Sequence, residues 1–219
     1  MARARIRPEP PRTDEPDLPP SLDPVALTRS GEVLGGRIEV GTGTSDGAYA
    51  RIGESVITAA SAGTLDLTGA VLSDVLVDQP ALAEWRAGQG TWRTVVVRGG
   101  RIGTLDASRG RWDGVILDGV RIDYLSWAAA DVHDAQITGC RIGTLDAPGG
   151  RLDRVCFTDS SVDEFDTREL QAQNLDLRGL DALAFTDVRA LRGATLGAAQ
   201  VAAHAASFAV ALGIDARDS

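Results

Sequence analysis

The chain lacks lysine altogether, so all 22 of its basic residues are arginines, and it contains only two histidines among 219 residues. The glycine-rich stretch 41–47 therefore cannot act as a P-loop, which requires a lysine. His133 and His204 have no partners at the spacing of a metal site, and no Ser/His/Asp or Cys/His constellation is evident. The sequence predicts no catalytic residue, no metal and no cofactor, and therefore a protein that is not an enzyme.

Long apolar runs are also missing from the sequence. No stretch of 18 apolar residues exists, and no apolar signal segment opens the chain. These absences predict a cytoplasmic protein without a membrane partner. Aromatic residues make up only 5% of the chain, which is expected for a thin core with room for few large rings.

What the chain does have is an unbroken five-residue pattern from Ile52 to Ala182. Of the 27 positions 52, 57, 62 and so on to 182, 26 are apolar and Thr167 is the exception. The residue two places before each of them is small or apolar. This period matches neither a helix, at about 3.6, nor a strand, at about 2. It fits three extended residues that point in, out and in, followed by a two-residue corner.

Four such corners close a square turn of 20 residues. The heptapeptide RIGTLDA occurs at 101–107 and again at 141–147, which is two turns later. One predicted corner is marked by residues that tolerate left-handed backbone angles, namely Gly99, Gly119, Gly139, Asp159 and Gly179. Repeats of 20–50 residues are typical of stacked architectures. The sequence therefore predicts an all-β solenoid of about seven 20-residue coils.

Individual units, such as Ala60-Ser-Ala62, Leu175-Asp-Leu177 and Leu180-Asp-Ala182, resemble the A-(D/N)-L-X-X units of pentapeptide-repeat proteins. The resemblance covers about 135 of the 219 residues and marks the chain as a divergent member. It implies a right-handed quadrilateral β-helix. One column departs from the family pattern, because its first inward residue is large instead of alanine: Leu65, Trp85, Leu105, Leu125, Leu145 and Phe165. The residues two places later are mostly small, which keeps the core volume nearly constant.

Several inward positions carry residues that could have other roles. All four tryptophans, Trp85, Trp92, Trp112 and Trp127, fall on inward positions and are interpreted as core packing, although an aromatic platform for sugars or bases is an alternative. Cys140 is expected to point inward and Cys156 outward on another coil, so no disulfide is predicted.

The composition divides the chain into three segments. Residues 1–44 form a predicted disordered arm rich in Pro, Arg, Asp and Glu, with residues 33–40 as a strand pair that caps the first coil. Residues 45–187 form the β-helix, and residues 188–219 form a linker and a helix. The predicted helix, residues 197–212, has an apolar stripe of Val201, Ala205, Phe208 and Leu212. It is expected to cap the open end of the solenoid, and the resemblance also implies a homodimer contact.

Two hypotheses for function follow from the predicted surface. An outward column is apolar at Val56, Leu76, Val96 and Ile116, which favours a protein-binding scaffold unless the N-terminal segment, for which residues 33–40 are the candidate, or a second copy covers the column. The net charge of −9 and the column of Asp106, Asp146 and Asp166 favour the alternative, an acidic DNA mimic. The resemblance implies DNA gyrase or another type II topoisomerase as the partner of such a mimic, with protection against quinolones. Neither hypothesis involves direct nucleic-acid binding.

Overall fold

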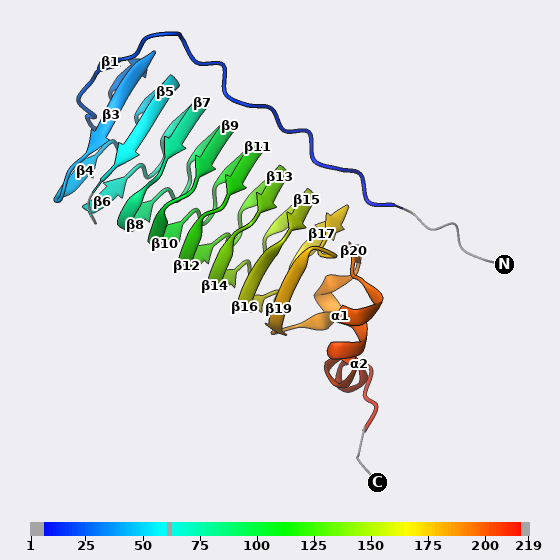
Figure 1. Cartoon of the computed structure of the whole chain (residues 1–219). Coiled ribbons are helices and arrows are strands. Elements are labelled where there is room, and N and C mark those ends of the chain that lie inside the picture. Colours follow the sequence, from blue (N-terminus) through cyan, green and yellow to red (C-terminus); the bar gives the residue numbers. More distant parts are fainter. Residues whose placement is uncertain (1–6, 61–62, 216–219) are drawn as a thin grey trace.

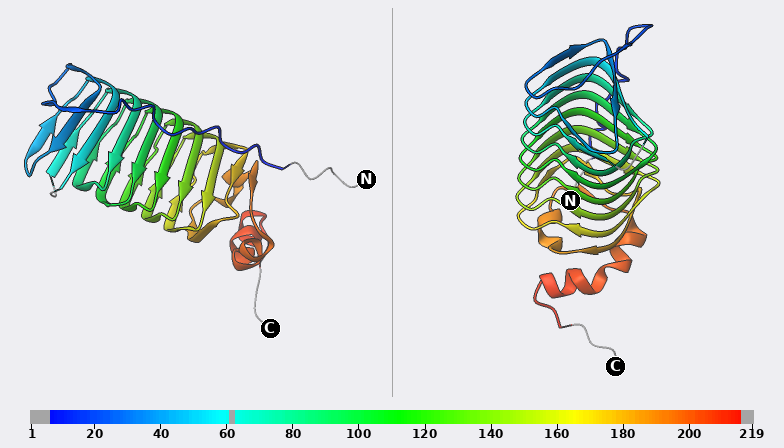
Figure 2. Two further views of the ribbon diagram at one scale, coloured as in Figure 1. Left: turned by 45° about the horizontal axis from the view of Figure 1, so that its top comes forward. Right: turned by 90° about the vertical axis from the view of Figure 1, so that its left-hand side faces the viewer.

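The computed structural model describes residues 7–60 and 63–215, which form an all-β parallel solenoid of about eight turns with a short helical region at its C-terminal end (Figure 1). The fold class predicted from the five-residue pattern is thereby confirmed. The views in Figure 2 show a straight rod with the helices at one end, and an N-terminal segment that runs back along the whole stack.

Each regular turn contributes one long strand and one shorter strand, which belong to two parallel sheets. The 12-stranded sheet consists of β1 Asp23–Pro24, β2 Glu32–Leu34, β3 Gly36–Val40, β5 Arg51–Ala59, β7 Val71–Asp78, β9 Thr91–Arg98, β11 Arg111–Asp118, β13 Asp131–Thr138, β15 Arg151–Thr158, β17 Gln171–Gln173, β18 Leu175–Asp176 and β20 Ala194–Thr195. The eight-stranded sheet consists of β4 Thr44–Asp46, β6 Gly63–Asp66, β8 Ala81–Arg86, β10 Arg101–Asp106, β12 Arg121–Ser126, β14 Arg141–Asp146, β16 Ser160–Asp166 and β19 Leu180–Phe185. In the regular part, residues 20 apart are paired, so side chains at equivalent positions of successive turns form columns.

The core consists of the inward columns that the sequence predicts. The large column from Leu65 to Phe165 is fully buried, and so are the residues two places later, most of which are small. Thr167 is also buried, and its hydroxyl donates a hydrogen bond to the carbonyl of Asp187 at 2.7 Å, which explains how a polar residue is tolerated there. Three inward positions of the described residues differ: Ala60 is exposed, and Gly100 and Ala172 are half-buried. The register shifts between Gly63 and Thr64, so that the buried Gly63 pairs with the inward residue Leu82; Ala59 is buried, and Ala62 lies outside the described residues.

The four tryptophans form one continuous cluster inside the rod. The rings of Trp92 and Trp112 stack with centroids 4.5 Å apart, Trp85 lies 5.0 Å from Trp92, and Trp127 meets Trp112 edge-on at 5.3 Å. All four are buried, which supports core packing and excludes an exposed platform formed by these rings.

The corners use left-handed backbone angles, as expected at Gly99, Gly119, Gly139 and Asp159. Gly179 serves a different purpose, because a Cβ atom there would lie 2.4 Å from the carbonyl oxygen of Phe157. A second left-handed corner, which the sequence analysis missed, bends each long strand at its fourth residue: Glu54, Asp74, Thr94, Gly114, Asp134, Arg154 and Asn174.

The N-terminal end differs from the predicted arrangement. Residues 32–40 are not a separate cap, because β2 and β3 pair with β5 and form the first turn. The cap is formed by the residues before them: β1 pairs with β3, and Leu27 packs against Gly47 and the core. The solenoid thus begins at Glu32, earlier than the expected residue 45.

At the C-terminal end the regular turns give way to the 3₁₀ helix η1 Val188–Leu191, the short strand β20 and two helices, α1 Ala198–Ala203 and α2 Ala205–Ala211. The single helix expected over 197–212 is interrupted at His204, whose ring nitrogen lies 3.1 Å from the carbonyl oxygen of Ala182. Gln200 donates hydrogen bonds to the carbonyls of Leu177 and Leu180 at 2.7 and 2.5 Å. Gln200 of α1 therefore satisfies two backbone acceptors at the open edge of the last turn.

Among the described residues, no helix has the length and apolarity needed to cross a membrane.

Candidate functional site

The predicted apolar column exists, but it is not an open surface. Parallel pairing places Val56, Leu76, Val96 and Ile116 in line on the outside of the 12-stranded sheet. Val96 is 0% exposed although it does not belong to the internal core, and the other three are half-buried. Side chains that point away from the core can be buried only if another part of the chain covers them.

The covering segment is residues 7–22, called the strap below, which runs along this face from the C-terminal end to the N-terminal end (Figures 1 and 2). Its contacts follow the turns in reverse order. The amide of Glu9 donates to the Oδ1 atom of Asn174 at 3.2 Å, the amide of Arg12 donates to Asp134 at 2.9 Å, and Glu15 pairs with Arg98 at 3.0 Å. The sequence predicts disorder for this segment, whereas the structure lays it against the solenoid.

The extended shape of the strap follows from its prolines, which are Pro8, Pro10, Pro11, Pro16, Pro19 and Pro20. Each proline fixes its own φ angle and biases the preceding residue toward extended conformations. Arg12 lies three positions after Glu9 in the strap. The residues that they contact, Asp134 and Asn174, lie two turns apart, which is about 9.6 Å at about 4.8 Å per turn. This advance of roughly 3.2 Å per residue matches a polyproline II helix, which rises about 3.1 Å per residue.

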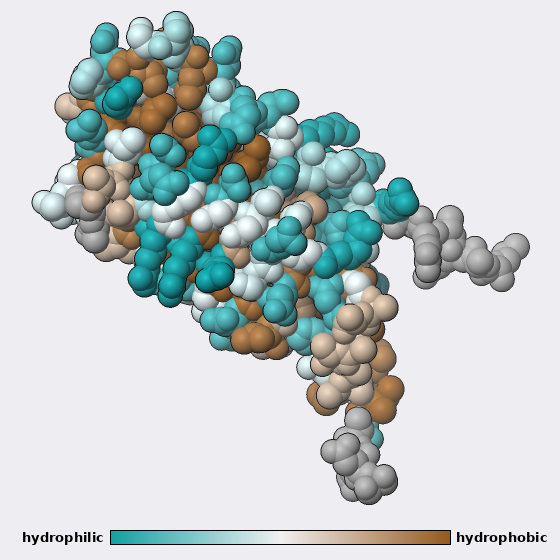
Figure 3. Space-filling view, viewed as in Figure 1, coloured by the Kyte–Doolittle hydropathy of each residue, from teal (hydrophilic) through white to brown (hydrophobic). Residues whose placement is uncertain are grey.

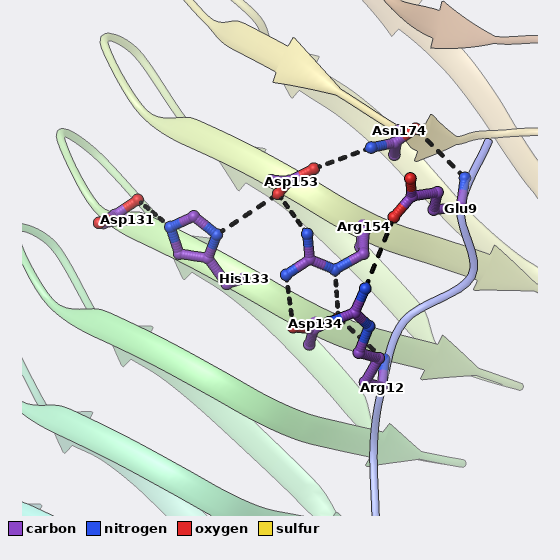
Figure 4. A network of polar contacts seen from close by, with 8 residues as sticks. All are labelled: Glu9, Arg12, Asp131, His133, Asp134, Asp153, Arg154 and Asn174. Atoms are coloured by element: carbon purple, nitrogen blue, oxygen red, sulfur yellow. Dashed lines mark hydrogen bonds and ion pairs between the residues drawn. The ribbon is translucent and has the colours of Figure 1, made fainter.

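A polar network anchors the strap where it crosses β13 and β15 (Figure 4). Arg154 donates two hydrogen bonds to the two carboxylate oxygens of Asp134, both at 2.7 Å, and a third to Asp153 at 2.7 Å. Asp134 is only 5% exposed. Burial opposes its ionisation, but the hydrogen bonds from Arg154 and from the Arg12 amide outweigh burial and hold the pKa of Asp134 below its usual range.

Sequence reasoning missed these anchor residues. Asp134, Arg154 and Asn174 belong to the second left-handed corner, which the sequence analysis did not predict. The available signal was the coincidence of a proline-rich segment with an apolar outward column that needs a cover.

The stripe predicted on the C-terminal helix is largely exposed. Val201, Ala205 and Leu212 are exposed, and Phe208 is half-buried. Three further apolar side chains lie exposed in the same region, Leu183, Val210 and Ile214. Neither α1 nor α2 contains a buried residue. Figure 3 shows this end of the molecule in pale and brown tones, in contrast to the polar surface of the middle turns.

The predicted acidic column is brought into register, with Ser126 between Asp106 and Asp146. The aspartates of this column form hydrogen bonds at the corner that follows them. Asp106 and Asp166 each accept a hydrogen bond from the amide two residues later, at 2.9 and 3.0 Å, as in an Asx turn. Asp146 precedes Pro148, which has no amide hydrogen, and accepts the Tyr124 hydroxyl at 2.8 Å instead.

Asp166 is also neutralised by its neighbour. Arg168 donates from Nε to both carboxylate oxygens at 3.0 and 2.9 Å. These bonds are the main cause that holds the pKa of Asp166 below its usual range. The column therefore offers fewer free negative charges than its sequence suggests.

The remaining reactive side chains form no recognisable centre. In residues 7–60 and 63–215, no group of three or more His, Cys, Asp or Glu residues is arranged to hold a metal ion. Both cysteines are free thiols: Cys140 points into the core, where burial raises its pKa to about 11, and Cys156 lies half-buried in the outward column.

Comparison with known proteins finds likeness only among solved structures. No protein-family model and no curated protein matches the chain. Two trypsin-treated variants of QnrB1, a plasmid-mediated fluoroquinolone resistance protein, are similar to it at 12% and 11% sequence identity. The similarity covers 89% and 87% of this chain and 100% of each QnrB1 chain, with TM-scores of 0.25 and 0.22. These TM-scores are too low to bear on function.

Proposed function

We propose that the chain is a divergent pentapeptide-repeat protein that acts without catalysis as a protein-binding scaffold, and that its C-terminal helical end joins it to a second copy. The observation that carries this proposal is the exposure of apolar side chains at that end. Val210 and Leu212 are 71% and 77% exposed. The apolar column on the long face, by contrast, is already occupied by the strap.

The two helices are too short to be stable on their own contacts. They contain six and seven residues with no buried side chain, whereas isolated helices below about 12–15 residues are marginal in water. Hydrogen bonds of Gln200, His204 and Arg189 and the edge-on contact between the rings of His204 and Phe185 hold them to the last turn at a few points. Burial of their exposed apolar face against a partner would supply the missing stabilisation.

A second copy fits this surface because of its charge. The protein carries a net charge of −9, so two copies repel each other across most of their surfaces. Residues 193–214 contain no Asp, Glu or Arg and form the region through which two copies can meet without repulsion. A two-fold contact at this end would bury the same side chains twice and leave the long faces of both rods free for other proteins.

Sedimentation velocity at several protein concentrations tests the assembly. The wild-type protein is expected to be dimeric at micromolar concentration, and Leu212→Asp is expected to be monomeric. Leu34→Asp is the matched control, because Leu34 is 70% exposed at the opposite end of the rod. A monomeric wild-type protein, or a dimer lost in Leu34→Asp but kept in Leu212→Asp, would contradict the proposed contact.

The alternative function is an acidic DNA mimic that acts on gyrase or another type II topoisomerase. It is supported by the straight rod and by the in-register aspartates at 106, 146 and 166. Their use in corner turns and the pairing of Asp166 with Arg168 weaken it. A gyrase supercoiling assay with and without a quinolone separates the two functions: neither inhibition nor protection at micromolar protein would set the mimic aside.

A further inference from the structure

A depression of about 620 Å³ lies on the outside of the 12-stranded sheet near its C-terminal end. It forms because the regular strands stop there. β15 has eight residues, but β17 pairs with it over only three, from Gln171 to Gln173. The helix η1 packs against β17 and forms the side of the depression beyond this strand. Outer side chains of β13, β15 and β17 form much of the rest, and the apolar residues Leu152, Leu170 and Ala172 complete the lining.

Three arginines line this depression: Arg151 from β15, Arg189 from η1, and Arg192 directly after η1. Within the part of the chain that the structure describes, none of the three forms an ion pair with a carboxylate. Arg189 uses its Nε atom to donate to the carbonyl of Ala211 at 2.7 Å, which keeps its side chain fixed beside the depression.

The two acids at the depression are already engaged by other groups. Asp131 lies 2.8 Å from the ring of His133, and Asp153 accepts hydrogen bonds from Arg154 at 2.7 Å and Asn174 at 3.1 Å (Figure 4). Three arginines against two carboxylates leave the lining with a net charge of +1, and each carboxylate is held by a group other than these arginines. An open, positively charged site attracts an anion when its guanidinium groups form no ion pair with a carboxylate of the protein.

We propose that this depression binds a small organic polyanion, either a phosphate ester or a polycarboxylate. The planar guanidinium group pairs with carboxylate and phosphate oxygens through two parallel hydrogen bonds, and three of them match a ligand with a charge of −2 or more. Gln171 and Gln173 also line the depression, and their side-chain amides are neutral donors. The volume lies within the range of about 300–1,000 Å³ that is typical of small-molecule sites.

Isothermal titration calorimetry of the full-length protein at constant ionic strength tests the site, with phenyl phosphate and citrate as separate probes. Saturable binding of at least one probe is expected. Arg151→Gln and Arg192→Gln should each weaken it about tenfold, because a hydrogen bond to a charged group contributes roughly 1.4 kcal/mol or more. Arg189 is left unchanged because it also holds α2.

The matched control is Arg111→Gln. Arg111 is exposed, lies in the same outward column as Arg151 two turns away, and is outside the depression. Unchanged binding in this variant, with loss in the other two, supports the site. Binding of phenyl phosphate alone or citrate alone identifies the ligand class. The proposal is overturned if neither probe binds at millimolar concentration, or if all three variants weaken binding equally, which would indicate attraction by net charge only.

Discussion

The strapped face and the helical end show two ways of treating apolar side chains that lie outside a solenoid core. On the strapped face, the chain covers its own column, and Val96 becomes as inaccessible as a core residue. At the helical end, Leu212 and Val210 are left exposed by the residues that the structure describes. The comparison teaches that an apolar outward column is not by itself a binding surface. What matters is whether a segment of the chain has the length and stiffness to cover it.

The largest expected effect follows from placing a charge under the strap. Val96→Asp buries a carboxylate with no partner and should lower the free energy of unfolding by about 3 kcal/mol or more. Val96→Thr, which keeps the shape, should cost about 1 kcal/mol. Urea unfolding followed by tryptophan fluorescence measures both, since the tryptophan cluster is in the core. A Val96→Asp midpoint equal to that of the wild type would show that the strap leaves this face in solution.

The anchor of the strap should give the next largest effect. Asp134→Asn removes the charge that Arg154 and the Arg12 amide contact, and it should cost about 2 kcal/mol at pH 7. Because the folded protein holds the pKa of Asp134 below the unfolded value of about 3.9, the stabilisation is complete above that value and is lost as the pH falls through the folded pKa. The difference between wild type and variant should therefore shrink below about pH 4.

Urea unfolding at pH 7, 4 and 3 measures this difference. Asp113→Asn is the control, because Asp113 is exposed and lies one turn away on the same sheet. A wild-type advantage that persists unchanged at pH 3, or an equal loss in Asp113→Asn, would assign the effect to general charge instead of the anchor.

The stiffness of the strap can be tested through Cys156. This thiol lies in the outward column between Gln136, which the Thr13 hydroxyl contacts at 3.3 Å, and Asp176. Replacing Pro10, Pro11 and Pro16 by glycine should favour strap opening by roughly 0.4–1 kcal/mol per residue, or about 10- to 100-fold in total. Labelling of Cys156 by a disulfide reagent should accelerate accordingly, while the core thiol Cys140 stays unreactive.

Mass spectrometry distinguishes the two labelled cysteines. Pro148→Gly is the control, because Pro148 lies at a corner of the other sheet, beside Ala129. Equal labelling rates in all variants would mean that the prolines do not limit access to the covered column.

The sequence predicts the core better than the surface for a physical reason. Inward residues such as Trp92 and Leu105 must repeat every five positions because each side of the turn needs them, so the period alone identifies them. The docking of the strap depends on Asp134, Arg154 and Asn174, which are brought together only after the turns have stacked. Proline-rich composition indicates an extended segment, but it does not reveal which face that segment covers.

The ends of the solenoid were less predictable for a related reason. Regular pairing stops at both ends, so single contacts decide the structure there. His204 interrupts the expected helix where its ring reaches the carbonyl of Ala182. Leu27 closes the first turn from a segment without any period. Neither contact leaves a repeated signal in the sequence.

The smallest expected effect on the free energy of unfolding of the isolated chain comes from a substitution at the helical end. Leu212→Asp replaces a side chain that the monomer does not bury, so its free energy of unfolding should lie within about 0.5 kcal/mol of the wild type at high dilution. A dimer gains stability with protein concentration, because the partner binds only the folded state. The wild-type melting temperature should therefore rise with concentration, whereas that of Leu212→Asp should not. Parallel behaviour of the two proteins would mean that Leu212 is exposed without taking part in assembly, in clear contrast to Val96.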